Sequence, residues 1–138
     1  NKNIQMYLMI LDIDNFKKFN DNYGHETGDL VLKNVSNGIS RIIKKNDLFG
    51  RWGGEEFVGV IEVVKNYEAT IFAERVRALV ENTQVVSKNG ENLHVTVSIG
   101  ITIVNKQDTI DTLIERSDKL MYESKIKGKN RITTDTNK

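Results

Sequence analysis

Two acidic clusters in the sequence have the composition of a cation-binding site. Asp12-Ile13-Asp14 ends an apolar run, and Glu55-Glu56 follows two glycines. Mg²⁺ takes hard oxygen ligands in octahedral geometry and is commonly held by one or two carboxylates together with substrate phosphates. Asp12 and Glu55 would meet that need if they face each other. Because a carboxylate at the end of a buried strand costs free energy unless it has a partner, Asp12 predicts a cation or a hydrogen-bond network.

The turn that contains Glu55 has two interpretations. Gly53 and Gly54 carry no Cβ, so a bulky triphosphate could approach their backbone, and the amides there could bind phosphate oxygens. Two glycines between strands are also good hairpin chemistry, which would leave Glu55-Glu56 as a solvated turn. For Asp14 we expect a helix N-cap rather than a metal ligand, because aspartate satisfies free N–H groups there.

The segment from residue 20 to 29 carries groups that could recognise a base. Taken singly, Asp29 predicts an N-cap of the following helix, and His25 a surface or capping residue. Guanine presents donors at N1 and N2 and an acceptor at O6. An aspartate paired with the amide of Asn20 matches that edge, because carboxylate accepts and amide donates.

Composition limits the class of protein. A chain of 138 residues is long enough for one core, so we expect a single domain over residues 1–133 and a polar tail over 134–138. The net charge of +1 gives no general attraction to nucleic acid or membrane, and the lack of cysteine excludes disulfides and thiolate zinc sites. No apolar stretch approaches the roughly 20 residues that span a bilayer. We expect the domain to act in the cytoplasm, including as the output domain of a membrane-anchored protein.

Hydrophobic periodicity and turn residues predict an alternation of strands and helices. The expected strands cover residues 6–13, 48–52, 56–64, 93–104 and, at an edge, 131–133. The expected helices cover residues 14–23, 29–45, 67–80 and 109–127. Asn89-Gly90 predicts a further hairpin. The order indicates an α+β fold, with helices flanking a mostly antiparallel central sheet.

Beyond single residues, the sequence resembles the GGDEF family of diguanylate cyclases, with GGEEF as a variant signature. The resemblance covers nearly the whole chain, in order and with family-like spacing. The matching motifs are Asp12-Ile13-Asp14-x-Phe16-Lys17-x-x-Asn20-Asp21, Gly24-His25-x-x-Gly28-Asp29, Arg51-x-Gly53-Gly54-Glu55-Glu56-Phe57, Val97-Ser98-Ile99-Gly100 and Asp118-x-x-x-Tyr122-x-x-Lys125-x-x-Gly128-x-Asn130-Arg131. The family fold resembles the palm of nucleotidyl cyclases and polymerases, with a ferredoxin-like core.

The resemblance implies a role for each matching residue. The metal ligands would be Asp12, Glu55 and the carbonyl of Ile13, with two Mg²⁺ per active site and Mn²⁺ as an alternative ion. Glu55 is also the implied base for the attacking 3′-hydroxyl, with Glu56 as a contributor, although a metal-bound carboxylate is a weak base. Lys17 would stabilise charge in the transition state. The implied substrate contacts are Asn20 and Asp29 to guanine, His25 near the substrate, the backbone of Phe16 to phosphate, and Lys125 and Lys129 to the triphosphate.

The implied reaction joins two GTP molecules into cyclic di-GMP and releases two pyrophosphates. One domain of this family holds one GTP, so two copies must meet face to face across a two-fold axis. The usual N-terminal segment of the family does not precede residue 12, so we expect this domain to lack that segment. We also expect a sensor or regulatory domain before it in the full-length protein. The resemblance implies no contact of this domain with nucleic acid or membrane.

One departure from the family pattern concerns product feedback. Inhibited members carry Arg-x-x-Asp before the signature turn, where this chain has Lys44-x-x-Asp47. Lysine keeps the charge but lacks the planar fork that grips phosphate or guanine at two points, so we expect weak or absent inhibition through that site. Lys129 stands where arginine is frequent. Two alternatives remain: a catalytically silent GTP-binding regulatory domain, and a cyclase of mixed GMP-AMP products, which Asp29 disfavours.

Overall fold

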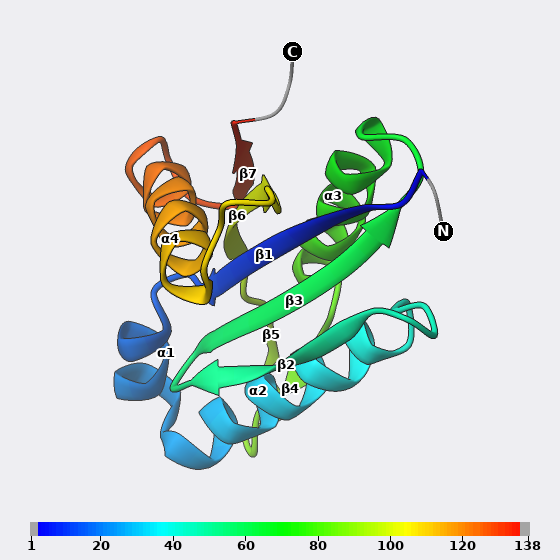
Figure 1. The fold of residues 1–138 in the computed structure, drawn as a ribbon. Coiled ribbons are helices and arrows are strands. Elements are labelled where there is room, and N and C mark those ends of the chain that lie inside the picture. The colour runs from blue at the N-terminus through cyan, green and yellow to red at the C-terminus, as the bar shows by residue number, and fades with distance from the viewer. Residues whose placement is uncertain (1–2, 136–138) are drawn as a thin grey trace.

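A five-stranded sheet with helices on both faces forms the domain (Figure 1). The computed structural model describes residues 3–135. The strands of the main sheet are β1 (Gln5–Ile13), β2 (Leu48–Gly53), β3 (Glu56–Val63), β6 (Val97–Ile103) and β7 (Arg131–Thr134). The helices are α1 (Phe16–Tyr23), α2 (His25–Ser40), α3 (Tyr67–Glu81) and α4 (Ile110–Ile126). Two short strands, β4 (Val85–Val86) and β5 (Asn92–Leu93), form a separate hairpin.

Strand β1 is the centre of the sheet. The order is β2-β3-β1-β6-β7, and β1 is antiparallel to both of its neighbours. Only β6 and β7 pair in parallel among the strands of residues 3–135. The β1-α2-β2-β3-α3-β6 succession has the connectivity of a ferredoxin-like core, so the predicted α+β fold with a mostly antiparallel sheet is confirmed.

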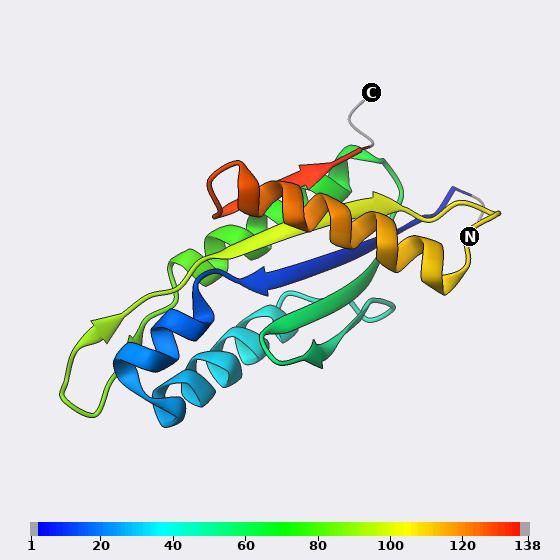
Figure 2. The same ribbon diagram turned by 90° about the vertical axis from the view of Figure 1, so that its left-hand side faces the viewer.

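The two faces of β1 pack against different helices because successive side chains point to opposite sides. Tyr7, Met9, Leu11 and Ile13 join the main core cluster, which α2 and α3 cover. On the other face lies α4, in front of β1 and β6 in Figure 2. This two-sided burial explains why β1 is apolar along most of its length.

Helix α4 lies unusually close to β6. A Cβ on Gly100 would collide with the backbone of α4, at Ser117 and Met121. The hydroxyl of Ser117 donates to the carbonyl of Gly100 at 2.9 Å, and that of Ser124 to the carbonyl of Ile99 at 2.8 Å. Both serines are fully buried, so these bonds satisfy polar groups that would otherwise be costly.

Several element boundaries differ from the sequence-based expectation. Helix α2 begins at His25 and ends at Ser40, so Asp29 lies inside the helix and its predicted N-cap role is wrong. The chain reverses instead at Gly24, whose φ of +90° suits a residue without a side chain. The expected long strand over residues 93–104 is interrupted, because residues 94–96 leave the ladder between β5 and β6. The Asn89-Gly90 hairpin is confirmed.

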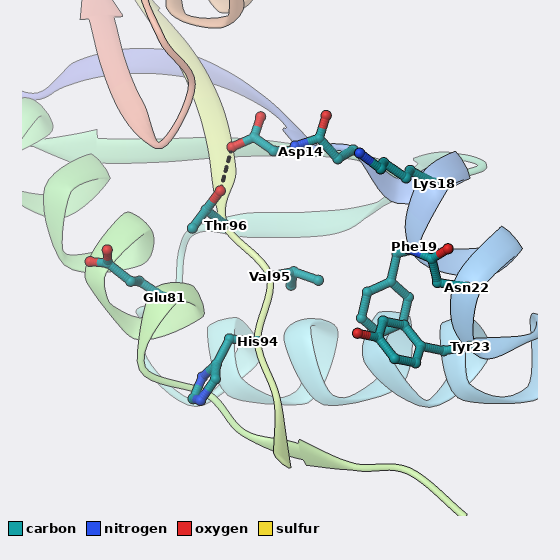
Figure 3. A pocket seen from close by; sticks show the side chains of 10 residues that line it. Asp14, Lys18, Phe19, Asn22, Tyr23, Glu81, His94, Val95 and Thr96 are labelled. Atoms are coloured by element: carbon teal, nitrogen blue, oxygen red, sulfur yellow. Dashed lines mark hydrogen bonds between the residues drawn. The ribbon is translucent and has the colours of Figure 1, made fainter. Parts of the chain in front are cut away.

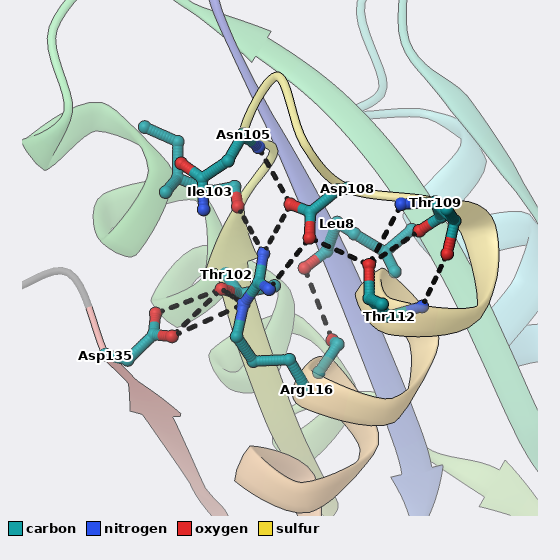
Figure 4. Close-up of polar contacts among 10 residues, drawn as sticks. Leu8, Thr102, Ile103, Asn105, Asp108, Thr109, Thr112, Arg116 and Asp135 are labelled. Carbon is teal, nitrogen blue, oxygen red and sulfur yellow. Dashed lines mark hydrogen bonds and ion pairs between the residues drawn. The ribbon is translucent and has the colours of Figure 1, made fainter.

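The end of β7 is fastened to the body of the domain (Figure 4). Of the five residues expected as a polar tail, Thr134 belongs to β7, and Asp135 accepts a hydrogen bond from the hydroxyl of Thr102 at 3.0 Å. Arg116 joins this group by donating to Thr102 and to both oxygens of Asp108. Residues 136–138 of the expected tail lie outside the described residues. Between residues 3 and 135, no helix is long and apolar enough to cross a membrane.

Candidate active site

The two acidic clusters meet where β1 ends. Asp12 is opposite Glu56 in the antiparallel ladder between β1 and β3. The amide of Ile13 donates to the carbonyl of Glu55 at 3.2 Å. The Gly53–Glu56 turn is therefore fixed against the carboxyl end of β1, and three carboxylates share one small region. The expected convergence of the two clusters follows directly from the central position of β1.

Asp12 has the least satisfied carboxylate of this group. Its Oδ1 is buried and has no hydrogen-bond partner. Burial raises the pKa of Asp12 from 3.8 to about 7, and Glu55, Glu56 and Asp14 add to the rise while Lys125 opposes it. The ionised carboxylate of Asp12 is disfavoured in the protein alone, and a bound cation would stabilise it.

The turn itself is fixed by its backbone conformation and by a side-chain contact from Arg51. Gly54 has a φ of +54°, which a side chain would oppose, and the guanidinium Nε of Arg51 donates to its carbonyl at 2.7 Å. A Cβ at Gly53 would meet nothing within 4 Å, so this position leaves free space above the turn. Burial, followed by repulsion from Asp118 and Glu55, raises the pKa of Glu56 above its usual range. Glu56 thus holds a proton more readily than an exposed glutamate does.

The donor set fits Mg²⁺ bound together with phosphate. Among the described residues, no group of three or more acidic, histidine or cysteine side chains is arranged to hold a metal unaided. Asp12, Glu55 and the carbonyl of Ile13 supply only oxygen, as Mg²⁺ prefers, and leave further positions for water or substrate. The unpartnered Oδ1 of Asp12 is the observation that favours a cation there.

Lys125 reaches the same region from α4, and Lys129 lies in the loop after that helix. The ammonium of Lys125 lies 3.1 Å from Oδ1 of Asp14, 3.7 Å from Oδ2 of Asp12 and 3.5 Å from the carbonyl of Ile13. Lys129 is half-buried in the α4–β7 loop with a φ of +66°. The structure therefore brings Lys125 to the acidic cluster, from a position 113 residues after Asp12 in the sequence.

Asp14 does not cap α1, so that prediction is wrong. The residue before the helix is Asn15, and its side chain makes no capping bond. Asp14 is 5% exposed and accepts hydrogen bonds from Thr96, Ser98, Lys125 and the amide of Asn130. No pattern in the sequence indicates this network, because its members are far apart along the chain.

Helices α1 and α2 place the residues expected to read the base. Oδ1 of Asn20 is buried without a partner and lies against Gly28, where a Cβ would overlap it. Asp29 follows Gly28 directly and is exposed, as is His25 at the start of α2. Asp29 and Arg51 are among the residues around a cavity of about 390 Å³ beside α2. The buried, unpartnered amide oxygen of Asn20 thus lies against Gly28, and the exposed carboxylate of Asp29 belongs to the next residue, near the start of α2.

Helix α1 begins two residues after Asp14, at Phe16. Phe16 is buried and begins the helix, whereas Lys17 is exposed. The first amides of a helix have no intrahelical acceptors, so those of Phe16 and Lys17 are available to an anion.

Lys44 and Asp47 lie at the opposite end of β2 from the signature turn. Asp47 is 7% exposed, and its carboxylate accepts from the amides of Lys44 at 3.1 Å and Glu62 at 3.0 Å. The ammonium of Lys44 donates to the carbonyl of Glu62 at 3.2 Å. Both side chains therefore hold the turn before β2.

A cavity of about 460 Å³ behind α1 was not anticipated (Figure 3). Its walls include Lys18, Phe19 and Tyr23 from α1, and His94 from the break between β5 and β6. None of the predicted site residues lines it. Asp14 connects it to the acidic cluster, and no motif in the sequence marks these residues.

Comparison with known proteins identifies the family. The model described as "Diguanylate cyclase, GGDEF domain" matches residues 1–131. The chain belongs to the GGDEF family. It is 38% identical over 131 residues to diguanylate cyclase A of Treponema denticola, covering 94% of this chain and 35% of that protein. It is 36% identical over 125 residues to diguanylate cyclase DosC of Escherichia coli, covering 91% of this chain and 27% of that protein.

Solved structures of GGDEF domains share the fold. The GGDEF domain of DgcB from Caulobacter crescentus, crystallised with c-di-GMP, superposes with a TM-score of 0.89 at 32% identity, covering 95% of this chain and 78% of that one. The active GGEEF domain of a diguanylate cyclase from Vibrio cholerae gives 0.83 at 30% identity, covering 97% and 85%. This GGDEF chain spans about a third of the length of the two curated relatives. The GGDEF family generally uses divalent metal ions.

Proposed function

We propose that this GGDEF domain is an active diguanylate cyclase that condenses two GTP into cyclic di-GMP and two pyrophosphates. The observation that carries the proposal is the buried, unpartnered oxygen of Asp12 beside Glu55, Glu56 and Lys125. A cation bound with the phosphates of GTP would satisfy this oxygen, and the full set of acidic residues beside it supports catalysis over GTP binding alone.

The base would be read between α1 and α2. The carboxylate of Asp29 accepts from the N1 and N2 donors of guanine, and the amide of Asn20 donates to an acceptor on the same ring. Gly28 lets the Asn20 amide lie close to α2. His25, exposed at the start of α2, lies near the ribose or base. Adenine would present its donors and acceptors in the wrong places for this pair.

The triphosphate would lie over the end of β1. The amide of Phe16 binds a phosphate oxygen at the helix N-terminus, and Lys17 neutralises charge that develops in the transition state. Lys125 and Lys129 hold the β- and γ-phosphates. Asp12, Glu55 and the carbonyl of Ile13 hold the divalent ions. When bound, two Mg²⁺, or Mn²⁺ in their place, would activate the attacking oxygen and neutralise charge on the leaving group.

In each half-reaction the 3′-oxygen of one GTP attacks the α-phosphorus of the other. A new phosphodiester bond forms, the bond to the β-phosphate oxygen breaks, and pyrophosphate leaves. The 3′-hydroxyl proton passes to a carboxylate. Glu56, whose pKa is raised, is the better acceptor if Glu55 is bound to metal, because coordination weakens a carboxylate as a base.

Catalysis would require a second copy of the domain. Each site offers one base-reading pair, Asn20 and Asp29, so each copy presents one GTP. A two-fold arrangement places each 3′-oxygen near the α-phosphorus of the other, which is chiefly a matter of positioning. A sensor or regulatory domain in the longer protein would control that encounter. The domain would work in the cytoplasm, where GTP is available.

Product feedback through Lys44 and Asp47 would be weak. Lys44 has one ammonium in place of a planar fork, and that ammonium already donates to the carbonyl of Glu62. The carboxylate of Asp47 is engaged by two backbone amides. A tight product-binding isotherm that disappears in a Lys44→Ala variant would contradict this expectation.

The test is incubation with GTP and Mg²⁺ followed by chromatography of the products. The protein should be assayed at several concentrations, because specific activity should rise as it dimerises. We expect one cyclic di-GMP for every two pyrophosphates from the native protein and none from Glu55→Gln. Glu115→Gln, which replaces an exposed glutamate on α4, is the matched control and should keep full activity. GTP binding without turnover at every concentration would refute the cyclase and support the silent alternative.

A further inference from the structure

Asp14 is the most completely satisfied carboxylate near the site. Its Oδ1 accepts from the hydroxyl of Ser98 at 2.6 Å and the ammonium of Lys125 at 3.1 Å. Its Oδ2 accepts from the hydroxyl of Thr96 at 2.7 Å and the amide of Asn130 at 3.0 Å. With both oxygens occupied by protein donors, Asp14 is not available to a metal. It differs in this from Asp12, two residues earlier, whose Oδ1 has no partner.

The contacts of Asp14 hold a loop that would not keep its shape alone. Gly128, Lys129 and Asn130 have φ values of +129°, +66° and +52°. Left-handed backbone costs free energy for residues with a side chain, least for asparagine. Two hydrogen bonds fix it, from the amide of Asn130 to Asp14 at 3.0 Å and from the amide of Lys129 to the carbonyl of Ser124 at 2.9 Å.

The same loop is also held from α3. The side-chain oxygen of Asn130 accepts from Arg77 at 2.8 Å, and its amide group donates to Glu81 at 2.8 Å. Arg77 is in turn paired with Glu74 and Glu81. Asn130 is therefore fixed on its backbone by Asp14 and on its side chain by α3. The backbone of Lys129, next to it, is therefore held in place as well.

We propose that Asp14 is a positioning residue, which sets Lys125 and the loop carrying Lys129 where the triphosphate of GTP binds. The inference rests on the proposed function only for the identity of the ligand. One carboxylate orients the ammonium of Lys125 directly and Lys129 through the backbone of Asn130. Asp14 itself touches neither substrate nor metal.

The test compares ligands that differ only in their phosphates. Binding of a non-reacting GTP analogue with an α,β-methylene bridge and of GMP is measured by calorimetry with Mg²⁺ present. In Asp14→Asn, one oxygen becomes an amide that faces donors, so either the Lys125 or the Asn130 contact is lost. We expect the analogue to bind at least tenfold more weakly and GMP to change less than twofold. Asp111→Asn, exposed in the first turn of α4, should change neither.

A double-mutant cycle separates positioning from a general structural effect. Lys125→Ala should weaken the analogue by a similar factor, and adding Asp14→Asn to it should cost much less than Asp14→Asn does alone. Equal losses for the analogue and GMP, full additivity of Asp14→Asn with both Lys125→Ala and Lys129→Ala, or tighter binding of the analogue to Asp14→Asn would each overturn the proposal.

Inorganic tripolyphosphate gives a measurement on the native protein, which needs no variant to fold. It should shift the amide resonance of Asn130 and the side-chain nitrogen resonance of Lys125, whereas GMP should leave both in place. No shift of either resonance at saturating tripolyphosphate would refute the proposal. Both binding tests stay decisive if the domain proves catalytically silent, so failure of the cyclase assignment is distinguishable from failure of this inference.

Discussion

Replacement of Asp12 by asparagine should stabilise the metal-free protein at alkaline pH. Burial raises the pKa of Asp12 to about 7 in the folded state, whereas the unfolded chain has the ordinary value of 3.8. The folded state thus holds this proton more tightly than the unfolded state does. Stability linked to Asp12 is fully present below pH 3.8 and is lost as the pH rises toward 7. An asparagine side chain at this position would have no proton to lose.

The magnitude follows from the difference between the two pKa values. From 3.8 to about 7, at 1.36 kcal/mol per pKa unit, the limit is roughly 4 kcal/mol. Water at the mouth of the site and reorientation of Lys125 screen part of the charge, so we expect about 2 kcal/mol. The Asp12→Asn variant should therefore gain about that much over the native protein between pH 4 and pH 8.

Urea unfolding in EDTA at pH 4, 6 and 8 measures the effect. The difference in unfolding free energy between the variant and the native protein should rise with pH and level off above 7. Added Mg²⁺ at pH 8 should stabilise the native protein, with less effect on Asp12→Asn, because an ion that binds only the folded state adds to its stability. If the difference in unfolding free energy is the same at all three pH values, the pKa of Asp12 is not raised by burial in the folded state. Asp111→Asn, exposed on α4, is the control.

Three further changes test the geometry. Gly28→Ala would force the amide of Asn20 aside. We therefore expect roughly tenfold weaker binding of GMP in calorimetry and a loss of stability of about 1–3 kcal/mol from overpacking. Unchanged affinity would contradict the base-reading role. Lys44→Arg restores a planar fork and should tighten cyclic di-GMP binding about tenfold in an isotherm. An unchanged isotherm would show that this turn does not contact the product. Gly100→Ala places a methyl group inside the backbone of α4 and should cost at least about 3 kcal/mol in urea unfolding; a near-native midpoint would show that α4 can move aside.

The fold was largely predictable because its strongest signals are local. An apolar run marked β1, and a helical period marked α3 and α4. The start of α2 was missed because the sequence offers two positions for it. Gly24 is both the last cap of α1 and the first cap of α2, whereas Asp29, a residue type typical of N-caps, lies inside the helix. The break between β5 and β6 was missed because the alternation of apolar and polar residues typical of a strand continues through residues 94–96.

The site was predictable only in part, for a related reason. Asp12 and Glu55 could be paired from their positions at a strand end and a turn. The partners of Asp14 could not be predicted, because they lie 82 to 116 residues away in the sequence and are mostly serine, threonine and asparagine residues that belong to no motif. The local sequence pattern predicted that Asp14 caps a helix, but in the fold its carboxylate binds residues that are distant in the sequence.

The close packing of α4 on Gly100 has a consequence for how the domain can vary. Ser117 and Ser124 are seven residues apart, about two helical turns, and both bind carbonyls of β6. They fix the axial register of α4, and one turn of slip would carry Lys125 about 5.4 Å along the sheet. A substitution at Gly100 that spares the carboxylates could therefore appear in kinetic assays as a substrate-affinity defect. Substitutions at buried packing positions such as Gly100 would then change the affinity for nucleotide without altering any side chain that contacts the nucleotide.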